Sequence, residues 1–205
     1  NKSYLAWSPD GKYLIYSAPG ESDENGLELY VLDFTDLSKP PVQVTDRRGD
    51  DTDASWSPDG QTIAFVNDGR EDKIRQIYFI DPQGQNLRRI SFDFEEYSPA
   101  WSPDGSSLLF VINGSGHQTI YIRQKSDDYE NPKTYDRSSF FGRLGNVDDL
   151  AFSPDGNWLA YMEIKNSRQF DIGNVRYSSL GGDFHVLTQD SDVDPETGKT
   201  VAIKF

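Results

Sequence analysis

Side chains able to carry chemistry are few in this 205-residue sequence, apart from its many acids. Cysteine is absent, which removes thiolate catalysis, disulfides and cysteine-based zinc sites. The two histidines, His117 and His185, lie far apart and share no motif. The sequence contains no Gly-Xaa-Ser-Xaa-Gly nucleophile elbow, His-Glu-Xaa-Xaa-His motif or glycine-rich phosphate loop. We therefore expect no catalytic constellation and no resident cofactor in this segment.

One acidic run has the spacing of metal ligands. Asp190, Asp192 and Asp194 follow the one-three-five pattern of a calcium-binding loop. Pro195 stands where such a loop needs glycine, and Val201 stands where it needs glutamate. A solvated acidic turn explains the same residues, so calcium is kept as the weaker alternative.

Charge and the length of the apolar runs each exclude one class of partner. Asp and Glu number 34 against 20 Lys and Arg, for a net charge of -14, and such a surface repels nucleic acid. The longest apolar runs, Leu108–Ile112 and Trp158–Met162, are much shorter than the roughly 20 residues of a membrane-spanning helix. We therefore expect neither nucleic-acid binding nor membrane insertion.

A repeated tetrapeptide organises the chain. Ser-Pro-Asp-Gly recurs at intervals of about 50 residues, in the range of propeller blades, at Ser8–Gly11, Ser57–Gly60, Ser102–Gly105 and Ser153–Gly156. An aromatic residue precedes each copy: Trp7, Trp56, Trp101 and Phe152. Proline suits the second position of a type I turn, and glycine at the fourth supplies a positive φ. We expect Gly11, Gly60, Gly105 and Gly156 to adopt that conformation, and the aromatic residues to pack between adjacent units.

Each turn is followed by two short apolar runs, such as Tyr13–Tyr16 and then Leu29–Leu32 in the first unit. Three units close with a string such as Val44-Thr45. Four short strands per unit predict an all-β chain, a β-propeller of four-stranded antiparallel blades. The expected blades are residues 1–48, 49–94, 95–143 and 144–189, with 190–205 as the inner half of a fifth.

This count favours a single domain over residues 1–205 that is a fragment of a larger propeller. The alternative is a natural four-bladed ring or open arc, whose exposed edges favour self-association.

The repeated pattern Ala-Trp-Ser-Pro-Asp-Gly-Xaa-Xaa-Leu/Ile-Ala-Phe/Tyr, followed by Ile-Tyr-Val/Phe-Xaa-Asp and Leu-Thr, resembles the TolB-like WD-repeat propellers. The resemblance covers nearly the whole chain and implies protein partners in a periplasmic or extracellular setting. The same blade type also occurs in the propeller halves of prolyl-oligopeptidase-like peptidases. Two functions therefore stay open, a non-enzymatic binding scaffold and a substrate-gating propeller of a larger peptidase. A carbohydrate lyase or hydrolase is less favoured, because such sites usually need several histidines or a metal cluster.

Acids and aromatics gather in the segments that join the blades. In a propeller these segments lie at one end, opposite the Ser-Pro-Asp-Gly turns. We predict there a surface for a cationic protein or peptide, formed by Asp50, Asp51, Asp53, Glu95, Glu96, Tyr97, Phe140, Phe141, Asp148 and Asp149. A solvated rim that keeps the protein soluble is the alternative.

Overall fold

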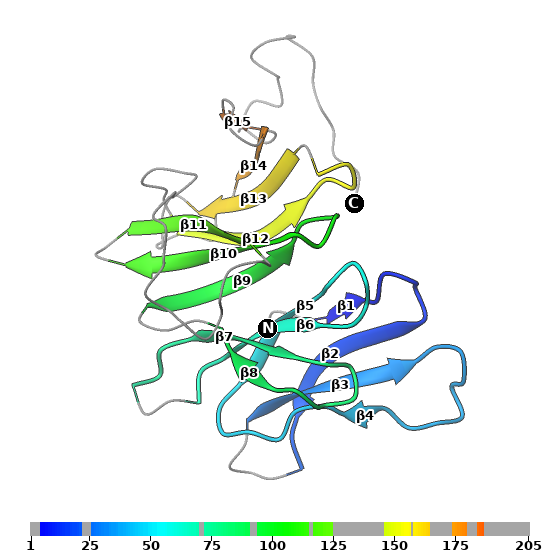
Figure 1. The fold of residues 1–205 in the computed structure, drawn as a ribbon. Helices are drawn as coiled ribbons and strands as arrows, with labels where there is room; N and C mark the ends of the chain where they lie inside the picture. The colour runs from blue at the N-terminus through cyan, green and yellow to red at the C-terminus, as the bar shows by residue number, and fades with distance from the viewer. Residues whose placement is uncertain are drawn as a thin grey trace.

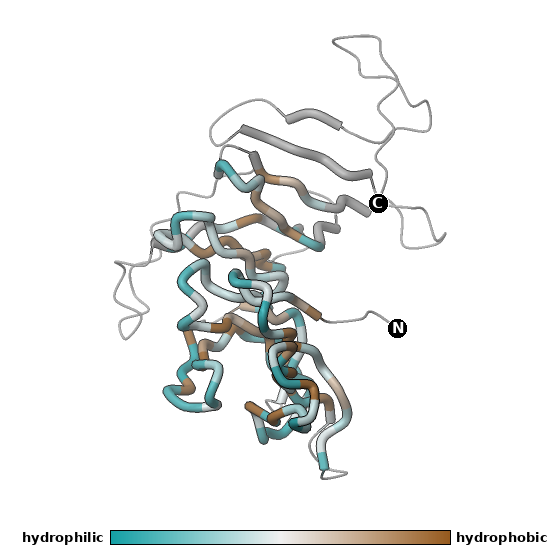
Figure 2. Tube along the Cα trace, turned by 90° about the vertical axis from the view of Figure 1, so that its right-hand side faces the viewer, coloured by the Kyte–Doolittle hydropathy of each residue, from teal (hydrophilic) through white to brown (hydrophobic). Residues whose placement is uncertain are grey.

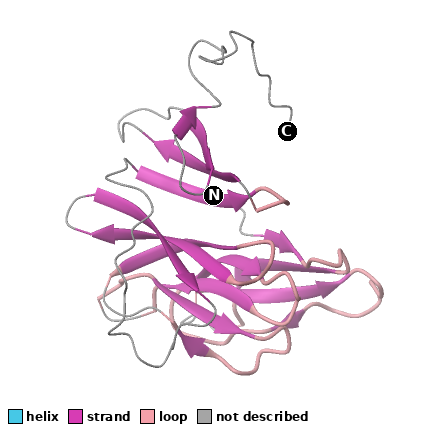
Figure 3. Ribbon diagram, turned by 45° about the horizontal axis from the view of Figure 1, so that its top comes forward, coloured by secondary structure: helices cyan, strands magenta, loops and turns pink. Residues whose placement is uncertain are grey.

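The computed structural model describes residues 5–21, 26–69, 72–90, 94–114, 117–124, 146–156, 158–164, 174–179 and 184–186. Strands are the only regular elements in these ranges, as Figure 3 shows, so the all-β prediction is confirmed. No helix in this part of the chain has the length and apolarity needed to cross a lipid bilayer.

Each repeat unit folds into its own antiparallel sheet (Figure 1). The first sheet consists of β1 (Leu5–Trp7), β2 (Tyr13–Pro19), β3 (Leu27–Asp33) and β4 (Val42–Gln43). The second consists of β5 (Asp51–Trp56), β6 (Ile63–Asn67), β7 (Gln76–Ile80) and β8 (Arg88–Arg89). In both sheets the strands pair in chain order, which is the meander expected of a blade.

The third sheet consists of β9 (Glu95–Trp101), β10 (Ser107–Gly114) and β11 (His117–Gln124). The fourth consists of β12 (Asn146–Phe152), β13 (Trp158–Ile164), β14 (Asn174–Ser179) and β15 (Phe184–Val186). The partial fifth blade expected at 190–205 lies outside the described residues.

The Ser-Pro-Asp-Gly turns form as the sequence predicts. In the first, the Gly11 amide donates to the Ser8 carbonyl at 2.9 Å, and Gly11 has a φ of 70°. The Ser8 hydroxyl donates to the Asp10 carboxylate at 2.7 Å and accepts from the Tyr13 amide at 2.9 Å. This arrangement closes the hairpin between β1 and β2 and recurs in the second and third units.

The residues that close the first unit, Val44-Thr45, lie just after its fourth strand. Val44 follows β4, and its amide donates to the Leu29 carbonyl at 2.8 Å. The Thr45 hydroxyl oxygen accepts a hydrogen bond from the Leu29 amide at 2.8 Å. The string is therefore buried against the third strand while the ladder itself ends at Gln43.

The aromatic residue of the second, third and fourth units packs on the preceding unit. Trp56 belongs to the cluster that includes Ile15 and Leu29 of the first sheet, and its indole N–H donates to the Ala6 carbonyl at 3.2 Å. Trp101 stacks on Phe79 of the second sheet at 5.1 Å between ring centroids. Figure 2 shows the apolar strands inside and hydrophilic loops outside.

Phe152 packs in the same way against the larger cluster, which joins the second, third and fourth sheets. Trp7 differs, because it is 51% exposed and its ring contacts that of Phe34 in its own unit, at 4.6 Å between ring centroids. The inter-blade packing predicted for these aromatics is therefore present at three positions, and wrong for Trp7 within the described residues.

Candidate functional site

The predicted acidic surface divides into buried and exposed members. Asp50 and Asp149 are exposed, and Asp53 and Glu95 are partly exposed. Asp51 and Glu96 are fully buried, and Tyr97 is 4% exposed, so their placement on a solvent-facing surface is wrong. The physical reason is position, because Asp51 begins β5 and Glu96 and Tyr97 lie in β9, two strands that are covered by the neighbouring sheet.

Asp51 meets a second buried acid, Glu28, which sequence reasoning missed. Asp51 accepts a hydrogen bond from the Asn67 amide group at 2.8 Å, and Glu28 accepts one from the Arg47 backbone amide at 2.9 Å. Burial, and then repulsion and hydrogen bonding with Glu28, raise the pKa of Asp51 to about 7 against the hydrogen bonds from Thr45 and Asn67. The pair thus holds a proton near neutral pH and joins the first two sheets.

The junction between the second and third sheets has an amide where the first junction has one of these acids. Gln76 has the place in β7 that Glu28 has in β3, and Glu96 stands five residues before Trp101, as Asp51 stands before Trp56. Gln76 is also buried, and its amide oxygen accepts from Arg89 at 3.0 Å. The common offset of Asp51 and Glu96 from the tryptophan was the sequence signal for a junction role.

A backbone irregularity recurs in the innermost strands. Asp53, Ser98 and Asp149, each three residues before the aromatic, have φ values of 51°, 52° and 53°. The strand pairing shifts register beside each of them. Left-handed backbone is uncommon for residues other than glycine and costs about 1–3 kcal/mol, so the repeated outlier calls for a functional hypothesis.

These three residues line one cavity. It has a volume of about 460 Å³ and is bounded by the inner strands β1, β5, β9 and β12. Its walls also contain the apolar side chains of Trp7, Leu150 and other residues, and no Lys or Arg is among the described residues that line it. We call this cavity the channel. It brings together two of the predicted site residues, Asp53 and Asp149.

The loop end of the first three sheets is less acidic than the sequence suggests. The Arg75 guanidinium pairs with Glu95 at 2.8 Å, and the Lys73 ammonium lies 3.9 Å from Asp68. Arg47 lies over the Tyr78 ring at 4.1 Å. Basic side chains thus interleave with the exposed acids there, which leaves the channel as the more uniformly acidic site.

Asp50 has a structural role at this end. Its carboxylate accepts from the Leu27 amide at 2.9 Å, and its own amide donates to Asp68 at 2.9 Å. Asp50 therefore ties the start of β3 to the loop after β6, and this bond competes with any role in a partner contact.

Several predicted residues cannot be placed. Phe140 and Phe141 lie outside the described residues, as do the calcium candidates Asp190, Asp192 and Asp194. Asp148 lies in β12, but only its backbone is described. His117 begins β11 and His185 lies in β15, so the two histidines belong to different sheets. Within the described ranges no three acidic or histidine side chains are arranged to hold a metal ion.

Comparison with known proteins supports the fold assignment. No protein-family model matches the chain. TolB of the Tol-Pal system from Francisella tularensis is 27% identical over 158 residues, which cover 77% of this chain and 34% of TolB. An uncharacterized peptidase, YuxL, from Bacillus subtilis is 26% identical over 188 residues, which cover 76% of this chain and 28% of the peptidase. The chain thus spans about a third of the length of these curated relatives.

A solved structure gives the same result. A putative TolB from Agrobacterium tumefaciens superposes with a TM-score of 0.72 and 20% identity, covering 90% of this chain and 64% of that protein. At this identity the likeness concerns the fold alone. The chain therefore has a TolB-like β-propeller fold, built from antiparallel sheets.

Proposed function

We propose that this chain is a non-enzymatic propeller module that binds a cationic protein or peptide, with a positive group of the partner entering the channel. The observation that carries the proposal is that Asp53 and Asp149 line one cavity whose described lining contains no lysine or arginine. Relatives of the TolB type support a protein partner and a periplasmic setting.

The channel suits this role physically. Its volume of about 460 Å³ lies within the roughly 300–1,000 Å³ of ligand pockets. Two carboxylates in a concave wall attract a cation more strongly than the same groups on a flat surface, because low-dielectric walls focus the field. The apolar side chains of Trp7 and Leu150 supply contact area for the stem of a long basic side chain.

A labelled peptide tests the proposal. Binding of a fluorescein-labelled (Gly-Lys)₄ peptide is followed by fluorescence anisotropy at low and high salt. Asp53→Asn combined with Asp149→Asn should weaken binding about ten-fold, as expected for two ion pairs of up to about 1 kcal/mol each. Asparagine tolerates the left-handed backbone, so the double variant should keep the fold.

The control removes the same charge elsewhere. Asp104→Asn combined with Asp155→Asn neutralises two acids in Ser-Pro-Asp-Gly turns and should leave affinity unchanged. Equal weakening by both double variants, or binding that raised salt does not affect, contradicts the channel as the site.

A second function has one observation in its favour. The B. subtilis relative is named a peptidase, and this chain matches only a part of it. On that hypothesis the propeller gates substrates for a hydrolase domain elsewhere in a longer polypeptide. Labelling of the natural full-length gene product by a serine-directed fluorophosphonate probe supports the peptidase hypothesis, and absence of labelling favours the binding module.

A further inference from the structure

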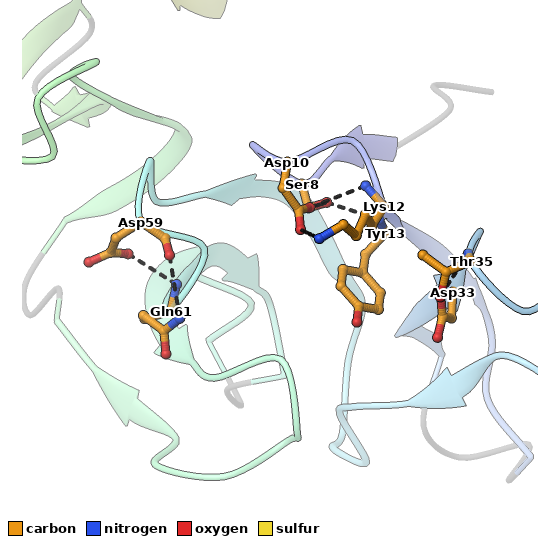
Figure 4. Close-up of polar contacts among 8 residues, drawn as sticks. All are labelled: Ser8, Asp10, Lys12, Tyr13, Asp33, Thr35, Asp59 and Gln61. Atoms are coloured by element: carbon orange, nitrogen blue, oxygen red, sulfur yellow. Dashed lines mark hydrogen bonds and ion pairs between the residues drawn. The ribbon is translucent and has the colours of Figure 1, made fainter.

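A second cavity lies at the turn end, between the first and second sheets, and it shares Pro9 and Trp56 with the lining of the channel. It has a volume of about 580 Å³. Its apolar wall includes Tyr13, Val31, Val42 and Trp56. Three aspartates lie in its lining, namely Asp10, Asp33 and Asp59. We call this cavity the turn-end groove, and Figure 4 shows its polar rim, with Tyr13 lying between the Asp59 and Asp33 turns.

The rim of the turn-end groove is negatively charged. Hydrogen bonds from the Thr35 side chain and backbone hold the pKa of Asp33 below its usual range. A hydrogen bond from Ser8 does the same for Asp10, which also pairs with Lys12 at 3.2 Å. The one basic side chain among the described residues of the lining, Lys39, lies 3.2 Å from Asp36. Asp33 and Asp59 thus face the groove as carboxylates that favour a cationic occupant.

The next junction of the same chain shows which cation fits. There the Arg88 guanidinium lies 5.5 Å from the centre of the Phe79 ring. Phe79 in turn stacks on Trp101. At the second junction an arginine therefore lies against an aromatic wall formed by Phe79 and Trp101.

Strand pairing relates the two junctions residue by residue. Phe79 pairs with Arg88 across β7 and β8, and Val31 pairs with Val42 across β3 and β4. Val42 therefore has the position of Arg88, Val31 that of Phe79, and Trp56 that of Trp101, so the aromatic part of the groove wall is Trp56 with Tyr13. At the first junction the repeat supplies no arginine of its own, and Val42 is 58% exposed.

We propose that the turn-end groove binds an arginine side chain of a peptide segment from a partner protein, in the position that Arg88 occupies one blade further on. The planar guanidinium stacks on an aromatic wall more readily than an ammonium does, and its N–H groups match the carboxylates of Asp33 and Asp59. The groove and the channel adjoin at Trp56, but their acids differ, with Asp33 and Asp59 here and Asp53 and Asp149 in the channel, so substitutions can separate this site from the proposed function.

The test uses three labelled peptides of the form Gly-Leu-Xaa-Leu-Gly. Xaa is arginine, lysine or citrulline, the last being a neutral analogue of arginine with nearly the same shape. Binding to the whole chain is measured by fluorescence anisotropy. The arginine peptide should bind about three-fold or more tighter than the lysine peptide and about ten-fold tighter than the citrulline peptide. Equal affinity for arginine and citrulline overturns the proposal.

Substitutions locate the site. Val42→Arg should place an arginine of the chain itself in the groove, at the position that corresponds to Arg88, and weaken binding of the arginine peptide about ten-fold or more. Arg88→Val is the matched control and should leave binding at the first junction intact. Asp59→Asn, which keeps a side-chain oxygen for the turn, should weaken binding about two- to five-fold.

The channel proposal and this one fail separately. Asp53→Asn combined with Asp149→Asn should not change binding of the arginine peptide, and Val42→Arg should not change binding of the (Gly-Lys)₄ peptide. Unchanged binding of the arginine peptide in both Val42→Arg and Asp59→Asn overturns the turn-end groove as the site.

Discussion

At the scale of single residues, the buried pair of Glu28 and Asp51 makes the junction between the first two sheets sensitive to pH. Both side chains are fully buried, and no described group donates a hydrogen bond to Glu28 Oε2 or Asp51 Oδ2. Two carboxyl groups in this arrangement cannot both ionise without a large cost. The pair therefore binds a proton in the folded protein at pH values where the unfolded chain has released it.

The pH dependence of stability follows. The pKa of Asp51 rises from 3.8 to about 7 on folding, so the folded state holds more protons between these values. The stabilisation that comes from protonated Asp51 is fully present below about pH 4. It is lost as pH rises to about 7, and the free energy of unfolding falls by roughly 1 kcal/mol per pH unit in this range. Asp51→Asn, which removes the titrating carboxyl group, should abolish most of this fall. Urea denaturation at pH 5 and pH 8 measures the effect.

An exposed acid provides the control for this experiment. Asp72 is exposed, and its carboxylate accepts a hydrogen bond from the Ile74 amide at 3.2 Å. Asp72→Asn should leave the difference in unfolding free energy between pH 5 and pH 8 as in the parent. The explanation is wrong if Asp51→Asn retains the parent difference.

Sequence patterns identified Asp51 as a candidate but missed its burial, and they missed Glu28 altogether. Asp51 follows a polar segment, which is typical of an exposed loop, and nothing local shows that the first sheet covers it. Glu28 lies between two leucines in a strand, and its burial depends on Asp51, Asn67 and Arg47, which are distant in sequence. Burial at a junction between sheets is a property of the packed pair and is not readable from either strand alone.

At the scale of elements, the Ser-Pro-Asp-Gly turns were predictable because their conformation is set by four adjacent residues. Pro fixes one φ, Ser and Asp bond to each other and to nearby amides, and Gly takes the positive φ. The bulges at Asp53, Ser98 and Asp149 were not predicted, because they depend on how the inner strands converge. The only local signal is an aspartate three residues before the aromatic in two units.

Glycine in the third turn provides a test at this scale. Gly105 has a φ of 68°, and a Cβ added there would lie 3.6 Å from Pro58, an ordinary contact. Gly105→Ala should therefore destabilise the fold through backbone strain alone, by about 1–2 kcal/mol. Urea denaturation checks the value.

A second glycine separates strain from space. Gly114 has no positive φ, and an added Cβ would meet only Phe94 at 3.8 Å. Gly114→Ala should be neutral or stabilising by up to about 1 kcal/mol. Similar losses at both positions would show that the positive φ is not the cause.

At the scale of the whole molecule, the sheets are held in series by one aromatic residue from each unit. Trp101 is 8% exposed and stacks on the sheet before it, whereas Trp7 has no such covering in the described structure. The repeat predicted this architecture because the same aromatic position recurs in every unit. It could not show that the first unit differs, since the difference depends on what lies beside it.

Truncation of these tryptophans measures the coupling between sheets. Trp101→Ala should lower the free energy of unfolding by about 3–5 kcal/mol, since it leaves a cavity between the second and third sheets. Trp7→Ala should cost less than about 1 kcal/mol, because its side chain is half exposed. Equal losses in thermal or urea denaturation would contradict the inter-sheet role of Trp101.

The central claim is that a cationic partner enters the channel between the inner strands. The most direct measurement is a titration of the ¹⁵N-labelled protein with (Gly-Lys)₄ peptide, followed by amide chemical shifts. The claim predicts that the largest changes fall at residues 53–56, 98–99 and 149–151, and that raised salt abolishes them. Changes confined to the outer loops at 46–50 and 72–75, with the inner strands unaffected, would contradict it.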